Sequence, residues 1–257
     1  MLTVALNPSS LVAAKNTLNR LCPHIKSSHR CEALARGLGA GTFATLRKSA
    51  HANAPIKVRS DVQAFCQYLG SHNFGAEARS FHLAVASMAV DAIAEQEPTL
   101  CVHGFGLGSP RHFPWEKPEA QRVLEARFRD QRKELGSERA LEGFLLASLF
   151  LKRVPCTQSI RPEAGSYWIK HIAENYPASY PEGGTLGPRY VPNGMLIAAA
   201  LHAGFAIKMA RDEQGHPHQT VTFNMSVAVL NALNDEFQPD SGRAQDRKRR
   251  REARRRH

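Results

Sequence analysis

The residues with the clearest chemistry are basic side chains in the last sixteen positions, GRAQDRKRRREARRRH. Nine of these residues are basic and two are acidic, so the segment carries +7 of the chain's net charge of +11. Guanidinium groups pair with phosphate oxygens in a bidentate geometry, and each neutralised phosphate releases counterions. The segment therefore predicts salt-sensitive binding to nucleic acid through its phosphate backbone. Its basic residues are Arg243, Arg247, Lys248, Arg249, Arg250, Arg251, Arg254, Arg255 and Arg256.

A second set of candidate nucleic-acid contacts lies well before this tail. Lys170 and His171 fall on the face of an expected helix, Tyr167 to Asn175, that we expect to be exposed, and Arg189 lies in the loop that follows. Contacts to phosphate hold a protein on a nucleic acid without reading its bases. These residues therefore predict affinity and predict no sequence specificity.

Histidine and cysteine pairs offer little support for a metal or catalytic site. Each pair lacks the second pair that a structural zinc site requires, and no nucleophile can be assigned to a His partner from sequence separation. We therefore predict no catalytic residues, no metal and no cofactor, and favour a protein that is not an enzyme. The pairs are His216 with His218, His171 with Glu174, and Cys101 with His103.

A glycine-rich loop follows an expected short strand, Leu100 to Val102. Its glycines at 104, 106 and 108 are spaced GxGxG, whereas a dinucleotide loop has GxGxxG and a Walker loop continues into Lys-Ser/Thr. The spacing favours a tight turn over a phosphate-binding loop.

The elements that must position these residues are mostly helices with a few short strands, an α+β fold of mainly α character. Apolar residues recur at helical spacing through most of the chain, and Asn7-Pro8 supplies a cap and a first-turn proline. We expect a small helical module over residues 1–52 and a mostly helical body over 61–238. The tail, residues 239–257, has almost no apolar side chains and is predicted to be disordered.

Two segments have the element order of known DNA-binding units. Residues 166–224 predict helix, loop, helix and hairpin, as in a winged-helix unit with Arg211 to Gln219 as the wing. Its second helix, Met195 to Leu201, has no side chain that reads a groove, so we expect a core helix there. Glu32 to Ser49 predicts either a helix-turn-helix or a helical hairpin that packs or binds protein.

The bulk composition is that of a globular chain, with 42% hydrophobic residues. The longest apolar run, Gly143 to Leu151, is far shorter than the roughly 20 residues that span a bilayer. The five cysteines show no disulfide or zinc spacing, and no signal peptide is evident at the first residues. We expect a cytoplasmic protein with reduced thiols and no membrane partner.

Two stretches resemble known bacterial families. Residues 6–46 resemble a short helical module called glyoxalase-related, which occurs in plasmid and phage proteins and has no established activity. The stretch Ser166-Tyr167-Trp168-Ile169-Lys170-His171, with Tyr190-Val191-Pro192-Asn193-Gly194 and Ala198-Ala199-Ala200, is similar to uncharacterised proteins of proteobacterial mobile elements. The resemblance implies a mobile-element setting and no glyoxalase chemistry, because the metal ligands of glyoxalases are not identifiable here.

The leading hypothesis is a nucleic-acid-binding accessory or regulatory protein of a mobile genetic element. In this hypothesis the basic tail supplies affinity, and residues 166–224 supply any selectivity. The alternative is a module that binds a host protein and inhibits a nucleic-acid enzyme or defence complex. An enzymatic reading rests only on the glycine loop and on scattered His and Cys residues.

Overall fold

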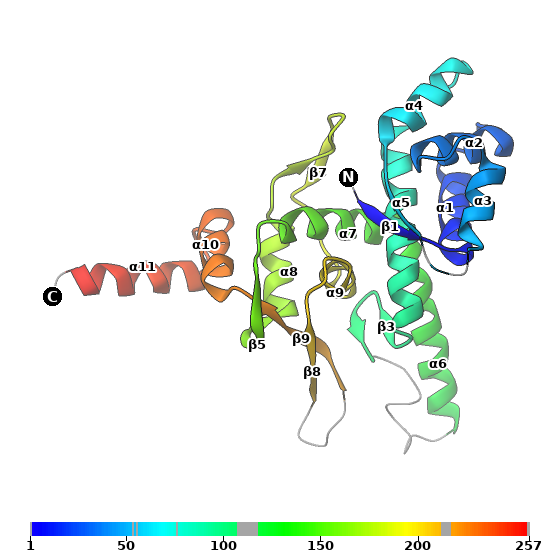
Figure 1. The fold of residues 1–257 in the computed structure, drawn as a ribbon. Helices are drawn as coiled ribbons and strands as arrows, with labels where there is room; N and C mark the ends of the chain where they lie inside the picture. Colours follow the sequence, from blue (N-terminus) through cyan, green and yellow to red (C-terminus); the bar gives the residue numbers. More distant parts are fainter. Residues whose placement is uncertain are drawn as a thin grey trace. The chain divides into compact units, whose positions relative to one another are not determined.

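The computed structural model describes residues 2–52, 54, 56–75, 77–106, 118–211 and 217–255. These residues form eleven α-helices and nine short strands, and every strand pairing is antiparallel. The predicted class, mainly helical α+β, is confirmed (Figure 1). The chain divides into two compact units. The first comprises Met1–Pro98, Lys133–Glu142 and Tyr180–Gly183, and the second comprises Thr99–Arg132, Gly143–Ser179 and Gly184–His257.

The first unit is a helical layer closed by a two-stranded ribbon. Strand β1 pairs with β2, and Thr3 lies opposite Arg59. Its elements are β1 (Thr3–Leu6), α1 (Pro8–Leu21), α2 (Ser27–Gly37), α3 (Phe43–Ala50), β2 (Ile56–Arg59), α4 (Val62–Ser71), α5 (Ala78–Gln96), a 3-10 turn (Glu134–Gly136) and the start of α7 (Glu138–Leu151).

Helix α1 begins where the sequence predicts. The Asn7 side chain accepts a hydrogen bond from the Ser10 amide at 2.7 Å, and the Ser10 hydroxyl accepts one from the Asn7 amide at 3.0 Å. Pro8 occupies the first turn, where an amide hydrogen would have no helical partner. The reciprocal bonds satisfy amides that the first turn leaves free.

The first unit differs from the predicted module of residues 1–52. Helix α1 packs along α5, and α2 packs along α4, so two helices assigned to the body belong here. Phe65 of α4 stacks on Phe81 of α5 with ring centroids 4.7 Å apart. Gly37 makes room for these rings, because a Cβ there would lie 2.5 Å from the Phe81 ring. The apolar stripe of α1 needs α5 to cover it, which a 52-residue module would not supply.

The second unit is built around a three-stranded sheet of order β5-β9-β8. Two shorter hairpins, β3 with β4 and β6 with β7, accompany it. Its elements are β3 (Leu100–Cys101), β4 (Gly104–Phe105), α6 (Pro118–Lys133), the rest of α7, β5 (Cys156–Gly165), α8 (Ser166–Glu174), β6 (Ala178–Ser179), β7 (Thr185–Gly187), α9 (Asn193–His202), β8 (Ile207–Arg211), β9 (Pro217–Met225), α10 (Val227–Phe237) and α11 (Gly242–Arg255).

The predicted order of helix, loop, helix and hairpin is present as α8, α9, β8 and β9. Residues 212–216, the centre of the predicted wing, lie outside the described residues. Sequence analysis did not predict β5. This strand lies at the edge of the sheet, most of its residues are exposed, and Pro162 interrupts its pattern, all of which weaken the strand signal.

Helix α9 is a core helix, as its apolar sequence predicts. All its residues from Asn193 to Ala200 are buried. Gly194 lies so close to the β3–β4 hairpin that a Cβ there would stand 1.9 Å from the Cys101 carbonyl oxygen. The Asn193 side-chain amide donates from Nδ2 to the backbone carbonyls of His103 and Gln219 at 3.3 and 3.1 Å. The hairpin therefore covers the helix that would read a groove in a winged-helix unit.

The end of the chain differs from the predicted disordered tail. Residues Gly242–Arg255 form helix α11, which follows α10 after a short turn (Figure 1). Arg, Lys, Gln, Glu and Ala are all good helix formers. An isolated charged helix of this length is only marginally stable in water. Contacts with α8 and α10, described below, therefore supply further stabilisation of α11.

The close approach at Gly194 yields a stability prediction. Gly194→Ser must displace the backbone of Cys101, and we expect it to lower the free energy of unfolding by about 3 kcal/mol. Gly165→Ser is the matched control, since no atom lies within 4 Å of a Cβ at Gly165 and serine suits this helix-capping position. Urea unfolding followed by circular dichroism measures both. Equal stability of the two variants would contradict the tight packing at Gly194.

Candidate nucleic-acid interface

The carboxylate of Glu174, at the end of α8, holds three groups. One oxygen accepts from the Lys170 ammonium at 2.9 Å and from the Val191 amide at 3.2 Å, and the other lies 2.7 Å from Nδ1 of His171. The Glu174 carbonyl also accepts from the Arg189 amide at 3.0 Å. Glu174 thus fixes the loop containing Arg189 and Val191 against α8.

Lys170 does not present its charge to solvent as predicted. Its side chain is only 5% exposed, and its ammonium is paired with Glu174. The same ammonium lies 5.2 Å from the ring centroid of Tyr167 and 4.8 Å from that of Tyr190. Burial of a charge requires such partners. The Lys170 ammonium is therefore buried between Glu174 and two tyrosine rings, and its contact with phosphate stays a prediction.

Two tyrosine rings beside Lys170 remain exposed. Tyr167 is 57% exposed and Tyr190 is 44% exposed. The His171 ring stands edge-on to Tyr167 with centroids 4.8 Å apart, and its side chain is 41% exposed. We call Tyr167, Lys170, His171 and Tyr190 the α8 aromatic cluster. Of the body residues predicted to contact nucleic acid, Lys170 and His171 belong to this cluster, and half-buried Arg189 precedes Tyr190 in the chain.

The tyrosines are functional candidates that sequence reasoning missed. Tyr167 precedes Lys170 by three residues and Glu174 follows it by four, so all three share one helical face. That spacing was a usable signal for a paired lysine flanked by an aromatic ring. Tyr190 gave no comparable signal, because only the fold brings it to Lys170.

The tail arginines fall into two groups, and one group docks α11 onto the body. Arg247 donates to Asp235 Oδ1 from Nε at 3.0 Å and from Nη2 at 2.6 Å, and its Nη1 donates to Asn231 at 2.8 Å. Arg251 lies 3.6 Å from the other Asp235 oxygen. The Arg243 guanidinium lies 4.7 Å from the Trp168 ring centroid. These arginines are four residues apart, which places them on one helix face.

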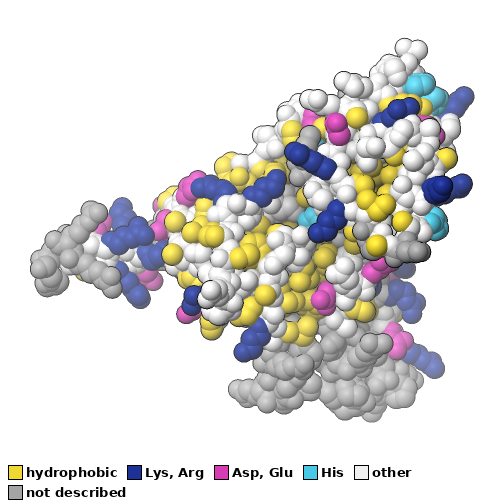
Figure 2. Space-filling model, in the orientation of Figure 1, with side chains coloured by type: hydrophobic (Ala, Val, Ile, Leu, Met, Phe, Trp, Pro, Cys, Tyr) yellow, Lys and Arg dark blue, Asp and Glu magenta, His cyan; other side chains and the backbone are white. Residues whose placement is uncertain are grey.

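The second group points to solvent. Lys248, Arg249 and Arg250 are exposed, and Figure 2 shows Lys and Arg side chains gathered over α11. Arg254 and Arg255 continue the helical backbone, but their side chains are outside the described part, as is the whole of Arg256. The nine predicted contacts are therefore not equivalent.

Polar bonds join α11 and the α8 aromatic cluster to the same framework. The Trp168 indole donates to Asn234 at 3.4 Å, and Asn234 donates to the Ser241 hydroxyl at 2.9 Å. The Gln238 amide donates to the His171 carbonyl at 2.8 Å. Helix α8 is thereby tied to the end of α10 and to the turn that starts α11.

The other predicted motifs have structural roles. Gly104 adopts φ 122° in the β3–β4 hairpin, where a Cβ would lie 2.2 Å from the Gln219 carbonyl oxygen. Gly106 has φ 77°, and Gly108 lies outside the described residues. The turn that the structure describes is at Val102 and His103, before the glycines, and Gly104 itself is in strand β4. In the segment resembling a helix-turn-helix, Leu46 is buried on α3.

Metal and nucleophile chemistry gain no support from the described residues. None of them forms a group of three or more His, Cys, Asp or Glu placed to hold a metal ion. His216 lies outside the described part. None of the five cysteines is in a disulfide. Burial raises the pKa of the Cys22 and Cys66 thiols, which disfavours their nucleophilic thiolates. No helix within the described ranges is long and apolar enough to cross a bilayer.

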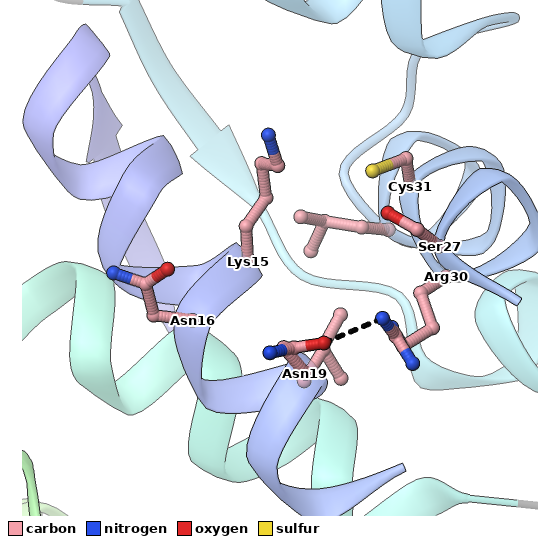
Figure 3. Close-up of a pocket in the computed structure, with 8 residues that line it drawn as sticks. Lys15, Asn16, Asn19, Ser27, Arg30 and Cys31 are labelled. Carbon is pink, nitrogen blue, oxygen red and sulfur yellow. Dashed lines mark hydrogen bonds between the residues drawn. The ribbon is translucent and has the colours of Figure 1, made fainter. Parts of the chain in front are cut away.

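A pocket of about 120 Å³ lies between α1 and α2 in the first unit (Figure 3). Its basic groups already have partners: Arg30 donates to Asn19 at 2.6 Å and to the Cys22 carbonyl at 2.8 Å, and Lys15 lies 5.5 Å from the Phe43 ring centroid. We therefore interpret the pocket as a gap in the packing between α1 and α2. Its lining residues are Lys15, Asn16, Leu18, Asn19, Ser27, Arg30, Cys31 and Leu34.

The role of Glu174 can be tested by stability. Glu174→Ala leaves the Lys170 ammonium buried without its carboxylate, and we expect a loss of about 3 kcal/mol in unfolding free energy. Adding Lys170→Met should recover part of this loss, because the unpaired charge is then gone. Glu236→Ala is the control, since its pair with Arg153 is exposed and is expected to contribute less than about 1 kcal/mol. Urea titration gives all four values, and equal losses for Glu174→Ala and Glu236→Ala would disprove the role.

The docking of α11 can be tested by hydrogen exchange. Arg247→Ala removes charge-assisted bonds to Asp235 and Asn231, so amide exchange across residues 245–255 should accelerate about tenfold. Arg250→Ala removes the same charge from the exposed face and should leave exchange nearly unchanged. Similar acceleration in both variants would show that α11 is held by something other than Arg247.

Comparison of the chain with protein-family models, curated proteins and solved structures finds no match. The resemblances to a glyoxalase-related module and to mobile-element proteins stay predictions. We therefore base the proposed function on the α8 aromatic cluster and on the two faces of α11.

Proposed function

We propose that this chain is a non-enzymatic nucleic-acid-binding protein that contacts the phosphate backbone through α11. The setting we propose, an accessory or regulatory role in a mobile genetic element, comes only from the sequence resemblance. The observation that carries the binding proposal is the pair of faces on α11. Arg247 anchors one face, while Lys248, Arg249 and Arg250 are exposed together on the same helix.

A docked basic helix suits phosphate binding better than a free basic tail. The anchored arginines hold the exposed ones in one place, so less conformational freedom is lost when phosphates bind. Arginine also offers donors in a fixed fork that matches phosphate oxygens. The binding energy is expected to come largely from counterion release and so to depend strongly on salt.

The exposed face of α11 favours nucleic acid over a protein partner. Its exposed described residues include Gln245, Asp246, Lys248, Arg249 and Arg250, which are all polar or charged. Protein interfaces rely on buried aromatic and other anchors at their centres, and this helix face offers none among these residues. Binding of a host protein thus has weaker support at this surface.

The proposal is tested by fluorescence anisotropy with a labelled oligonucleotide over a series of salt concentrations. Replacing Lys248, Arg249 and Arg250 together with Ala should lower affinity at least about tenfold at low salt. It should also reduce the slope of log K against log salt by about 2, since each phosphate contact contributes about 0.7–0.9.

The matched control replaces three exposed basic residues of the first unit, Lys48, Lys57 and Arg59, with Ala. The change in net charge is identical, so a weaker effect shows that position on α11 matters. Equal weakening by both triple variants, or absence of binding by the parent chain at low salt, would overturn the proposal.

A further inference from the structure

The exposure of Tyr167 and Tyr190 is unusual for rings that share a buried neighbour. Both stand within about 5 Å of the Lys170 ammonium, yet 57% and 44% of their surfaces remain open. Large aromatic side chains are usually covered in the core or at an interface. These two rings therefore lie at the surface, beside the paired ammonium of Lys170.

The rings are also preorganised. Lys170 is fixed by its bond to Glu174, and Glu174 in turn holds the backbone of Val191 beside Tyr190. Tyr167 belongs to helix α8 and has His171 edge-on against it. Ordering costs on binding fall when contact residues are already fixed. The two tyrosines of the α8 aromatic cluster are thus held in place while much of each side chain stays exposed.

Cationic residues lie at or beside the chain neighbours of the two tyrosines. Trp168, the next residue after Tyr167, stacks with Arg243 at the start of α11, and Arg189 precedes Tyr190. A ligand that reaches from the rings to α11 must combine flat aromatic groups with negative charge. Single-stranded nucleic acid has this combination, because its bases are free to leave the stack while its phosphates repeat along the strand.

Resting on the proposed phosphate binding by α11, we infer that Tyr167 and Tyr190 stack with unpaired bases of single-stranded nucleic acid. In a duplex the bases stack on one another, so their faces are covered and the tyrosine rings cannot stack on them. The helix that would enter a duplex groove, α9, is buried under the β3–β4 hairpin. Single strands are therefore the preferred ligand, read by stacking and without base-specific hydrogen bonds.

The experiment uses the full chain and labelled oligonucleotides in fluorescence anisotropy at fixed salt. The probes are a 20-nucleotide oligo(dT), the same length of oligo(U), a 20-base-pair duplex and an abasic strand of equal phosphate number. The parent chain should bind oligo(dT) at least about fivefold more tightly than the abasic strand, given the usual contribution of base stacking. The oligo(dT) and oligo(U) arms separate DNA from RNA as the source of the bases.

Tyr167→Ala and Tyr190→Ala should each weaken oligo(dT) binding about fivefold or more, with the salt dependence unchanged. Tyr167→Phe and Tyr190→Phe keep the rings and should stay within about twofold of the parent chain. Duplex binding should be the same in all variants within about twofold.

Equal affinity of the parent chain for oligo(dT) and the abasic strand would overturn the inference without needing any variant to fold. So would Tyr→Ala variants that bind oligo(dT) as well as the parent chain, or that lose duplex binding equally. In each of these cases, salt-sensitive binding that is lost on replacing Lys248, Arg249 and Arg250 leaves the proposed function standing. Failure to bind any probe at low salt would remove both.

Discussion

The buried ion pair between Lys170 and Glu174 is the interaction on which the candidate surface depends. A lysine charge removed from water is tolerated only when its partner is close and well bonded, and here the carboxylate lies 2.9 Å away. The same carboxylate takes the Val191 amide, so one group fixes both a helix and a distant loop. Tyr167 and Tyr190 both lie against the paired ammonium. Because Lys170 is buried and paired, it adds little positive charge to the surface.

The basic residues of the tail do not all have the same role in the folded chain. Counted from composition, its arginines form one solvated polyanion-binding segment. In the folded chain, Arg243 and Arg247 serve α11 itself, through Trp168 and through Asp235 with Asn231. The exposed basic residues that follow, Lys248, Arg249 and Arg250, acquire a fixed position from that docking. In the proposed function, the docking of α11 and the binding of phosphate therefore depend on different residues of one helix.

Much of the fold could be predicted from local signals. The Asn7-Pro8 start of α1, the start of α10 after Ser226 and the core character of α9 all depend on cap chemistry or composition. What could not be predicted depends on contacts between distant residues. Strand β5 exists because β9 pairs with it, and α11 is held through Asp235. Lys170 looked exposed by its type, whereas its burial depends on Tyr190, twenty positions later in the chain.

Asp235 has a consequence for the far half of α11. It bonds Arg247, whose side chain is 21% exposed, and it lies 3.6 Å from Arg251, whose side chain is 68% exposed. The Asp235 carboxylate therefore has one close, largely covered arginine partner and one more distant, exposed arginine partner. If phosphate binds to α11 as proposed, a phosphate that pairs with the Arg251 guanidinium competes with Asp235 for it. Docking of the last turns of α11 and binding of the proposed ligand would then compete for the same Arg251 side chain.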